Sequence, residues 1–262
     1  AAHPVSRRKS ILIVEDNDDI RFYIQDNLRS DYTVYQAVNG KEGWKKAQEL
    51  QPDMIISDVM MPEMDGMELL HKIKSDTHTS HIPVILLTAR VADEQKLEGL
   101  NSGAVDYITK PFSFEMLQSR IKALLLQQES MRKLFQKQIE INPKEISATP
   151  VDEKFISHAI EIVEKNISEA EFSVEDLSKA LFMSRVALYK KLLSLTGKAP
   201  LDFIRVIRMK RAAQLMEKTQ MTVSEIAYEV GFGNPKYFTK SFKKEFGKLP
   251  SEYIAEKRKS SG

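Results

Sequence analysis

The stretch MIISDVMMPEMDG spans residues 54–66, where an apolar run ends at Asp58 and a loop leads to Asp65 and Gly66. Similar short runs, rich in β-branched residues, recur on both sides of it, and the strands expected from them are 11–15, 33–37, 54–58, 84–88 and 106–109. The amphipathic stretches that follow predict helices at 18–28, 41–49, 66–74, 93–100 and from 114 onward. This alternation predicts an α/β domain with a five-stranded, doubly wound parallel sheet.

Charged and polar side chains stand where the expected strands end, namely Glu15, Asp16, Asp58, Thr88 and Lys110. Because ligands bind at the carboxyl edge of an open parallel sheet, we expect these side chains to meet there. Three carboxylates in one place repel one another unless a cation is present, and hard oxygen ligands suit Mg²⁺. A carboxylate beside Mg²⁺ can accept a phosphoryl group, while a lysine and a hydroxyl neutralise the transferred oxygens.

The formal charge is divided unevenly along the chain. The 262 residues carry a net charge of +2, but 10–127 hold 12 Lys and Arg against 19 Asp and Glu, whereas 151–262 hold 20 against 15. The length favours two domains. An acidic half joined to a basic half is expected when one binds cations and the other a polyanion, although a solvated basic surface explains the second half equally well.

The chain contains no cysteine, which excludes disulfides, thiolate zinc sites and thiol chemistry. Its longest apolar runs, 11–14 and 84–87, are far shorter than the roughly 18 residues that a membrane helix requires. No signal-peptide core lies near the start. We therefore expect a segment that makes no membrane contact and works in the cytoplasm.

The apolar pattern thins over 128–150, where Lys, Gln and Glu dominate and two prolines interrupt any continuous helix. We interpret this stretch as a linker between domains at 10–127 and 151–262, with 1–9 as a basic linker-like tail. Up to residue 140 the apolar residues recur at roughly helical spacing. This part therefore either extends the preceding helix or forms a solvated connector.

The second half contains an internal repeat with a shift of about fifty residues. The segments 173–176 and 222–225 both match a capping box that opens a short helix. Ser184 and Asn234 are expected to cap second helices, each of which ends at a glycine that a proline follows three residues later. A short helix, a turn and a second helix, present twice, predict an all-helical domain with two helix-turn-helix units.

A joining helix is expected over 201–217 and would be about 25 Å long at 1.5 Å per residue. The second helix of a helix-turn-helix unit enters the major groove of DNA. A joining helix of this length would hold two such helices about one DNA turn apart. Duplex DNA is therefore the predicted partner of the basic half.

Residues 10–127 resemble the receiver domain of response regulators, through DVMMPEMDG at 58–66, the Lys110-Pro111-Phe112 triplet and the acidic pair after the first strand. The resemblance implies a flavodoxin-like fold in which Asp58 accepts a phosphoryl group from the phosphohistidine of a histidine kinase. It also implies the ligands of Mg²⁺, which are Glu15 through water, Asp16, Asp58 and the backbone carbonyl of Met60.

The same resemblance gives roles to residues around Asp58. Lys110 pairs with the phosphoryl oxygens, Thr88 moves toward them and Tyr107 rotates inward as the switch. These movements remodel the face formed by 93–100, the fifth strand and the fifth helix. The bond between Lys110 and Pro111 is expected to be cis. By residue type alone, Tyr107 fits a core tyrosine with a hydrated hydroxyl equally well.

The second half resembles AraC-type DNA-binding domains, most clearly in IAYEVGF at 226–232 and YFTKSFKKEF at 237–246. Matching positions on the two recognition helices give the candidate DNA contacts Arg185, Val186, Tyr189, Lys190, Asn234, Lys236, Tyr237 and Lys240. Lysine and arginine bind guanine or phosphate and asparagine reads adenine, but Asn234 is alternatively only a helix cap. Lys191, Lys243 and Lys244 are expected to be solvated or to face phosphates.

A receiver fused directly to an AraC-type domain resembles the cytoplasmic end of the hybrid two-component regulators of Bacteroides-like bacteria. The chain shows no initiator methionine and no kinase region. We therefore expect an excised part of a hybrid sensor kinase that is anchored in the inner membrane. Phosphorylation of Asp58 is expected to change the dimerisation or the DNA binding of a transcription regulator that is not itself an enzyme.

Two alternative functions stay open. One is a constitutive DNA binder whose receiver serves as a phosphate-independent docking module. The other is an aspartyl-phosphate phosphatase, which would also use a strand-end aspartate with Mg²⁺. Such an enzyme needs a second aspartate two residues further on as acid and base, and this chain has Met60 there. Phosphoryl uptake and turnover distinguish the three functions.

Overall fold

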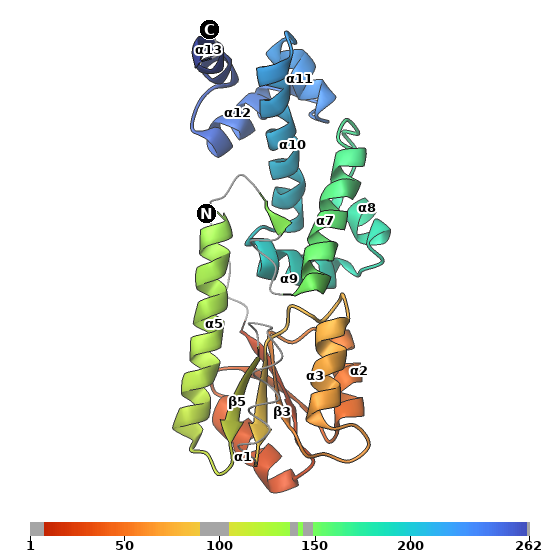
Figure 1. Cartoon of the computed structure of the whole chain (residues 1–262), viewed down its shortest axis with the longest axis vertical. Helices are drawn as coiled ribbons and strands as arrows, with labels where there is room; N and C mark the ends of the chain where they lie inside the picture. Colours follow the sequence, from red (N-terminus) through yellow and green to blue (C-terminus); the bar gives the residue numbers. More distant parts are fainter. Residues whose placement is uncertain (1–7, 90–104, 137–140, 144–148, 261–262) are drawn as a thin grey trace. The chain divides into compact units, whose positions relative to one another are not determined.

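The computed structural model describes residues 8–89, 105–136, 141–143 and 149–260 (Figure 1). The chain divides into two compact bodies: an N-terminal body of 1–130 with 148–152, and a C-terminal body of 131–147 with 153–262. Among the described residues, all strands lie in the N-terminal body, and the described part of the C-terminal body is helical. The predicted combination of an α/β fold with an all-helical fold is confirmed.

The N-terminal body is built on the strands β1 Ser10–Val14, β2 Thr33–Ala37, β3 Met54–Asp58, β4 Val84–Thr88 and β5 Val105–Thr109. They are parallel and lie in the order β2-β1-β3-β4-β5, the doubly wound order of flavodoxin-like folds. The register pairs Asp58 with Leu87 and Thr88 with Thr109. The carboxyl ends of neighbouring strands therefore meet at one edge of the sheet.

Both faces of the sheet are covered by helices, which are α1 Asp18–Leu28, α2 Gly40–Leu50, α3 Gly66–Ser75 and α5 Phe114–Gln136 (Figure 1). Successive residues of a strand point to opposite faces. Leu12 and Val14 accordingly pack in the cluster that holds residues of α2 and α3, and Ile11 and Ile13 in the cluster that holds residues of α1 and α5. The helix expected at 93–100 lies outside the described residues.

The helix α5 continues past residue 127 and ends at Gln136. This extent favours the extended helix over the solvated connector for 128–136, while 137–140 lie outside the described residues. Across the described ranges, no helix combines the length and the apolar composition that crossing a bilayer requires.

The C-terminal body contains, in its described part, α7 Pro150–Lys165, α8 Val174–Ala180, α9 Arg185–Thr196, α10 Pro200–Lys218, α11 Val223–Glu229, α12 Pro235–Phe246 and α13 Pro250–Ser260. Both predicted capping boxes are present, at Ser173 before α8 and at Thr222 before α11. Ser184 and Asn234 cap α9 and α12 through their side-chain oxygens. These caps fix the two turns of the repeat.

The helix α10 joins the first helix-turn-helix unit, α8 with α9, to the second, α11 with α12. Phe203 and Ile207 pack in the core cluster of the first unit, whereas Met209 and Met216 pack in that of the second. The 19 residues of α10 span about 28 Å at 1.5 Å per residue. Each unit therefore has its own apolar core on one shared helix.

Gly66 begins α3 directly after the loop that follows Asp58. A Cβ atom at this position would lie 2.1 Å from the carbonyl oxygen of Asp58, far inside van der Waals contact. Gly66→Ala should therefore displace the loop and lower the free energy of unfolding of the N-terminal body by about 2 kcal/mol. Urea unfolding followed by the fluorescence of Trp44, the only tryptophan of the chain, measures this effect.

Met60→Ala is the matched control, because Met60 lies on the same loop and 63% of its surface is exposed. We expect this change to alter the free energy of unfolding by less than about 0.5 kcal/mol. If Gly66→Ala unfolded at the same urea concentration as Met60→Ala, the loop would accommodate a side chain and the close approach at Gly66 would not constrain it.

Candidate functional site

Three acidic side chains meet at the carboxyl edge of the sheet. One carboxylate oxygen each from Glu15, Asp16 and Asp58 lies within 4.8 Å of the other two. Glu15 is only 1% exposed and Asp58 7%, whereas Asp16 is exposed to solvent. Strand β1 ends at Val14, one residue earlier than expected, so Glu15 and Asp16 both belong to the loop that faces Asp58.

Lys110 lies between the two buried carboxylates. Its Nζ atom is 2.9 Å from Oε2 of Glu15 and 3.1 Å from Oδ1 of Asp58. Its backbone N–H donates to the carbonyl of Thr88 at 2.7 Å, and the bond to Pro111 is cis, as expected. One ammonium does not neutralise three carboxylates. The cluster with its hard oxygen ligands therefore fits a divalent cation such as Mg²⁺.

Burial and neighbouring charges shift the pKa values of Glu15 and Lys110. Burial raises the pKa of Glu15, and the charge of Asp58 raises it further, while hydrogen bonding to Lys110 partly opposes the shift. Burial by itself would lower the pKa of Lys110, but its hydrogen bonds to Glu15 and Asp58 and their charges raise it above the ordinary value. Lys110 is therefore positively charged at neutral pH.

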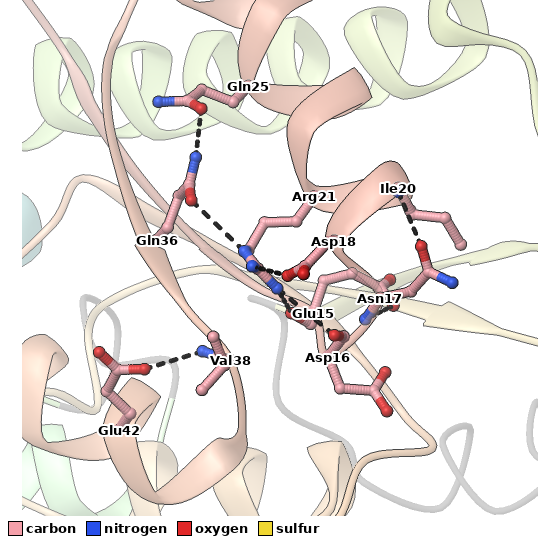
Figure 2. Close-up of polar contacts among 10 residues, drawn as sticks. All are labelled: Glu15, Asp16, Asn17, Asp18, Ile20, Arg21, Gln25, Gln36, Val38 and Glu42. Atoms are coloured by element: carbon pink, nitrogen blue, oxygen red, sulfur yellow. Dashed lines mark hydrogen bonds and ion pairs between the residues drawn. The ribbon is translucent and has the colours of Figure 1, made fainter.

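The loop after β1 is held by a residue that sequence reasoning missed. Figure 2 shows Arg21 of α1 directed toward this loop, where its Nη1 donates to the carbonyl oxygen of Glu15 at 2.7 Å. Arg21 also forms an ion pair with Asp18 and donates from Nε to the side chain of Gln36 at 3.3 Å. Its only signal in the sequence is the i,i+3 pair with Asp18, which is common on helices without a site.

The loop after β3 positions Asp58. The backbone N–H of Val59 donates to Oδ1 of Asp58 at 2.9 Å, and the N–H of Gly66 donates to the carbonyl of Val59 at 2.9 Å. Met60 lies on this loop with its side chain largely exposed. The predicted roles of Asp58 as phosphoacceptor and of the Met60 carbonyl as ligand stay predictions.

The two predicted switch residues lie on neighbouring strands. Thr88 ends β4, next to the residue that pairs with Asp58, and it is completely buried. Tyr107 on β5 is half-buried and packs against the core cluster on the α2 and α3 side. Tyr107 thus has the core contacts of the alternative interpretation, and the switching roles of both residues stay predictions.

Most candidate DNA contacts lie on exposed faces of α9 and α12. Arg185, Val186 and Tyr189 of α9 are exposed and Lys190 is half-buried. The exposed candidates at the second unit are Asn234, Lys236, Tyr237 and Lys240. Arg185 also pairs with Glu175 of α8 at 3.3 Å. The oxygen of the Asn234 side chain accepts the backbone N–H groups of Lys236 and Tyr237, so its capping role is confirmed.

Lys191 corrects an expectation about the first unit. We expected it to be solvated or phosphate-facing, but it is completely buried. Its Nζ lies 4.8 Å from the centroid of the Phe155 ring, a favourable position for a cation against the face of an aromatic ring. Lys243 and Lys244 are exposed, as expected. Lys191 belongs to the core because its helix position faces α7 rather than solvent.

Comparison with known proteins agrees with these two bodies. Residues 11–122 match the response regulator receiver domain, and residues 177–256 match a helix-turn-helix domain. Histidine kinase P4 of Formosa agariphila is 45% identical over 246 residues, which are 94% of this chain and 18% of that protein.

Two further relatives match the N-terminal body alone. The DNA-binding dual master transcriptional regulator RpaA of Synechocystis is 42% identical over 116 residues, 44% of this chain and 48% of that protein. The alkaline phosphatase synthesis transcriptional regulatory protein PhoP of Bacillus subtilis is 41% identical over 122 residues, 46% of this chain and 50% of that protein. The chain thus spans less than a fifth of the histidine kinase and about half the length of each regulator.

The strand order and the match over residues 11–122 identify the N-terminal body as a receiver domain of the two-component type. The chain contains a receiver domain followed by an AraC-type helix-turn-helix domain, the two domains that response-regulator transcription factors combine.

Lys110→Ala removes the positive charge that both buried carboxylates contact. We expect it to lower the free energy of unfolding of the N-terminal body by about 2 kcal/mol at pH 7 without metal, since part of the lost interaction is screened by solvent. This loss should shrink as the pH falls through the raised pKa of Glu15, because protonation removes one of the repelling charges. Urea unfolding followed by Trp44 fluorescence in the presence of a chelator measures both effects.

Lys122→Ala is the control for this prediction, because Lys122 is exposed on α5 of the same body. It should leave unfolding unchanged at every pH. Millimolar Mg²⁺ should restore part of the stability lost in Lys110→Ala. Equal stability of the two variants at pH 7 would show that Lys110 does not compensate the buried carboxylates.

Proposed function

We propose that Asp58 accepts a phosphoryl group from the phosphohistidine of a histidine kinase and that this modification controls DNA binding by the C-terminal body. The observation that carries the proposal is the meeting of Glu15, Asp16 and Asp58 beside Lys110. In the transfer, an oxygen of Asp58 attacks phosphorus, the bond from phosphorus to the imidazole nitrogen breaks, and that nitrogen keeps the electron pair and takes up a proton.

The residues present fit a magnesium site. Asp16, Asp58 and the carbonyl of Met60 would be direct ligands, and Glu15 would act through water, as in other receivers. The bound ion supplies positive charge that offsets the carboxylates and the transferred oxygens. Lys110, whose Nζ contacts Asp58, would give up this contact and pair with one phosphoryl oxygen. Thr88 would then supply a hydroxyl to another.

Phosphorylation of Asp58 would change the conformation of the receiver through movements of Thr88 and Tyr107. The added negative charge favours inward positions of both side chains and shifts the receiver between two faces, with a coupling free energy of about 1–3 kcal/mol. We propose that the phosphorylated face pairs two copies of the chain or releases the C-terminal body for DNA. The similarity to a histidine kinase over most of this chain supports an origin within a longer chain that contains a histidine kinase. We propose in addition that this parent protein is a hybrid sensor kinase anchored in the inner membrane.

On DNA, α9 and α12 would enter successive segments of the major groove. The exposed Lys236, Lys240 and Arg185 supply positive charge for phosphates or guanine. Val186, Tyr189 and Tyr237 are each about half exposed and offer apolar surface to thymine methyl groups and sugars.

The first test of this function is phosphoryl uptake. The full chain is mixed with acetyl phosphate and Mg²⁺, and intact mass spectrometry is expected to show one added phosphoryl group. Asp58→Asn should take up none, because an amide is not nucleophilic enough to replace the carboxylate. Removal of Mg²⁺ should also abolish uptake, because the crowded carboxylates then repel the donor.

The possible outcomes separate the three functions. No uptake by the parent chain would favour the phosphate-independent docking module. Rapid multiple turnover of acetyl phosphate would favour the phosphatase. Uptake that persists in Asp58→Asn would place the acceptor elsewhere and contradict the proposed role of Asp58.

The second test concerns DNA. Lys240→Ala should weaken binding to a duplex selected from random sequence by the parent chain about fivefold and reduce the salt slope by about 1, because one phosphate contact is lost. Lys165→Ala is the matched control, since Lys165 is exposed on α7 outside the residues that match a helix-turn-helix domain. Fluorescence anisotropy at several salt concentrations measures both. Equal slopes in the two variants would remove Lys240 from the DNA interface.

A further inference from the structure

A buried guanidinium lies where the two helix-turn-helix units approach each other. Arg208, near the middle of α10, is 8% exposed. Its Nη1 donates to the carbonyl of Gly231 at 3.0 Å, and its Nη2 donates to the carbonyl of Glu169 at 2.5 Å. Glu169 lies in the turn before α8, and Gly231 in the turn between α11 and α12. One side chain thus joins the connection that leads into the first unit to the turn of the second unit.

The two carbonyls are the hydrogen-bond partners that compensate the buried charge of Arg208. Within the described residues no carboxylate pairs with it, and its Nε has no hydrogen-bond partner. Burial lowers the pKa of the guanidinium, yet an arginine side chain stays protonated in proteins. A buried charge without its hydrogen bonds is strongly unfavourable. Movement of either turn away from Arg208 would therefore be opposed.

Gly231 lets the turn between α11 and α12 lie close to Arg208 and to the turn after α7. A Cβ atom there would lie 2.6 Å from the carbonyl oxygen of Ile167, in the turn after α7, and 2.9 Å from Cζ of Arg208. The backbone of Gly231 has a φ of +73°, a conformation that favours glycine. Both the backbone conformation and the available space therefore argue against a side chain at this position.

The matching position in the first repeat shows which of the two constraints on Gly231, its backbone conformation or the space around it, excludes a side chain. Phe182 occupies the matching turn of the first unit, and its N–H donates three residues back, to Lys179, as that of Gly231 does to Tyr228. Phe182 also has a positive φ, +54°, but its side chain is 89% exposed. The turn itself thus accepts a large residue. What distinguishes Gly231 is the contact with Ile167 and Arg208.

We propose that Arg208 is a positioning residue that fixes the separation and orientation of α9 and α12, and with them the half-site spacing that the chain accepts on DNA. The DNA part of this inference rests on the proposed function. The apolar cores of the two units are separate clusters on either side of Arg208 along α10. The hydrogen bonds from Arg208 and the contact at Gly231 tie the connection between α7 and α8, which leads into the first unit, to the turn of the second unit. They add to the link that α10 itself makes between the two units.

The geometry can be measured without DNA. The chain has no cysteine, so Val186→Cys with Lys236→Cys places two spin labels at exposed positions of α9 and α12 in the full chain. We expect Arg208→Met to widen the distance distribution between the labels about twofold, because both hydrogen bonds from a charged donor are lost. Arg208→Lys should widen it less, since an ammonium can still reach one carbonyl.

Arg211→Met is the matched control, because Arg211 is exposed on the same helix and its removal takes away the same charge. It should leave the distribution as in the parent chain. If Arg208→Met fails to fold by circular dichroism, Arg208→Lys and Gly231→Ala carry the test, the latter because it separates the turns while it keeps the guanidinium. A parent-like distribution in the Arg208 and Gly231 variants that fold would overturn the proposal.

A second arm tests the consequence for DNA. Duplexes with two copies of a selected half-site, spaced from about 9 to about 13 base pairs, are compared by anisotropy with a duplex of one half-site. We expect the spacing preference to fall about tenfold in Arg208→Met, with unchanged binding to one half-site. An unchanged preference would overturn the DNA part of the proposal. If the parent chain binds no duplex, the proposed function fails, while the spin-label distances still decide whether Arg208 fixes the two units.

Discussion

Two nearly buried carboxylates, Glu15 and Asp58, share the ammonium of Lys110, and the function proposed for the N-terminal body depends on this crowding of charge. Burial and the charge of Asp58 raise the pKa of Glu15, so the arrangement is unfavourable by itself. The apolar clusters on both faces of the sheet hold it in place. A site kept under such repulsion responds strongly when a cation binds or when one carboxylate is modified.

The C-terminal body also contains a buried charge, but this charge is compensated by different groups. Arg208 is buried as well, but the carbonyls of Glu169 and Gly231 take the place of carboxylates. Carbonyl groups do not titrate and their positions are fixed by the turns that carry them. The stability of the acidic cluster therefore depends on the charge of its members, whereas that of the contacts of Arg208 depends on the geometry of the backbone. Under the proposed function, the chain needs both properties, a charge that phosphorylation changes in one body and a fixed distance between recognition helices in the other.

The surface proposed for DNA combines charged and apolar side chains. Val186, Tyr189 and Tyr237 are about half exposed on the recognition helices, whereas Lys236 and Lys240 give the positive charge. The charge supports attraction to any duplex, and the apolar groups can add contacts that depend on sequence. The basic charge of the second half by itself predicts only binding to any duplex, whereas the apolar side chains on this face can also distinguish one DNA sequence from another.

The sequence by itself determined features that depend on a few neighbouring residues or on the direction of strands. The capping boxes at Ser173 and Thr222 are local, and the meeting of Glu15 with Asp58 follows because parallel strands end at one edge. Only the tertiary structure decided that Lys191 is buried and that Arg208 bridges two turns. A basic residue on a helix looks the same in sequence whether it faces solvent or a neighbouring helix, because burial depends on how distant elements pack.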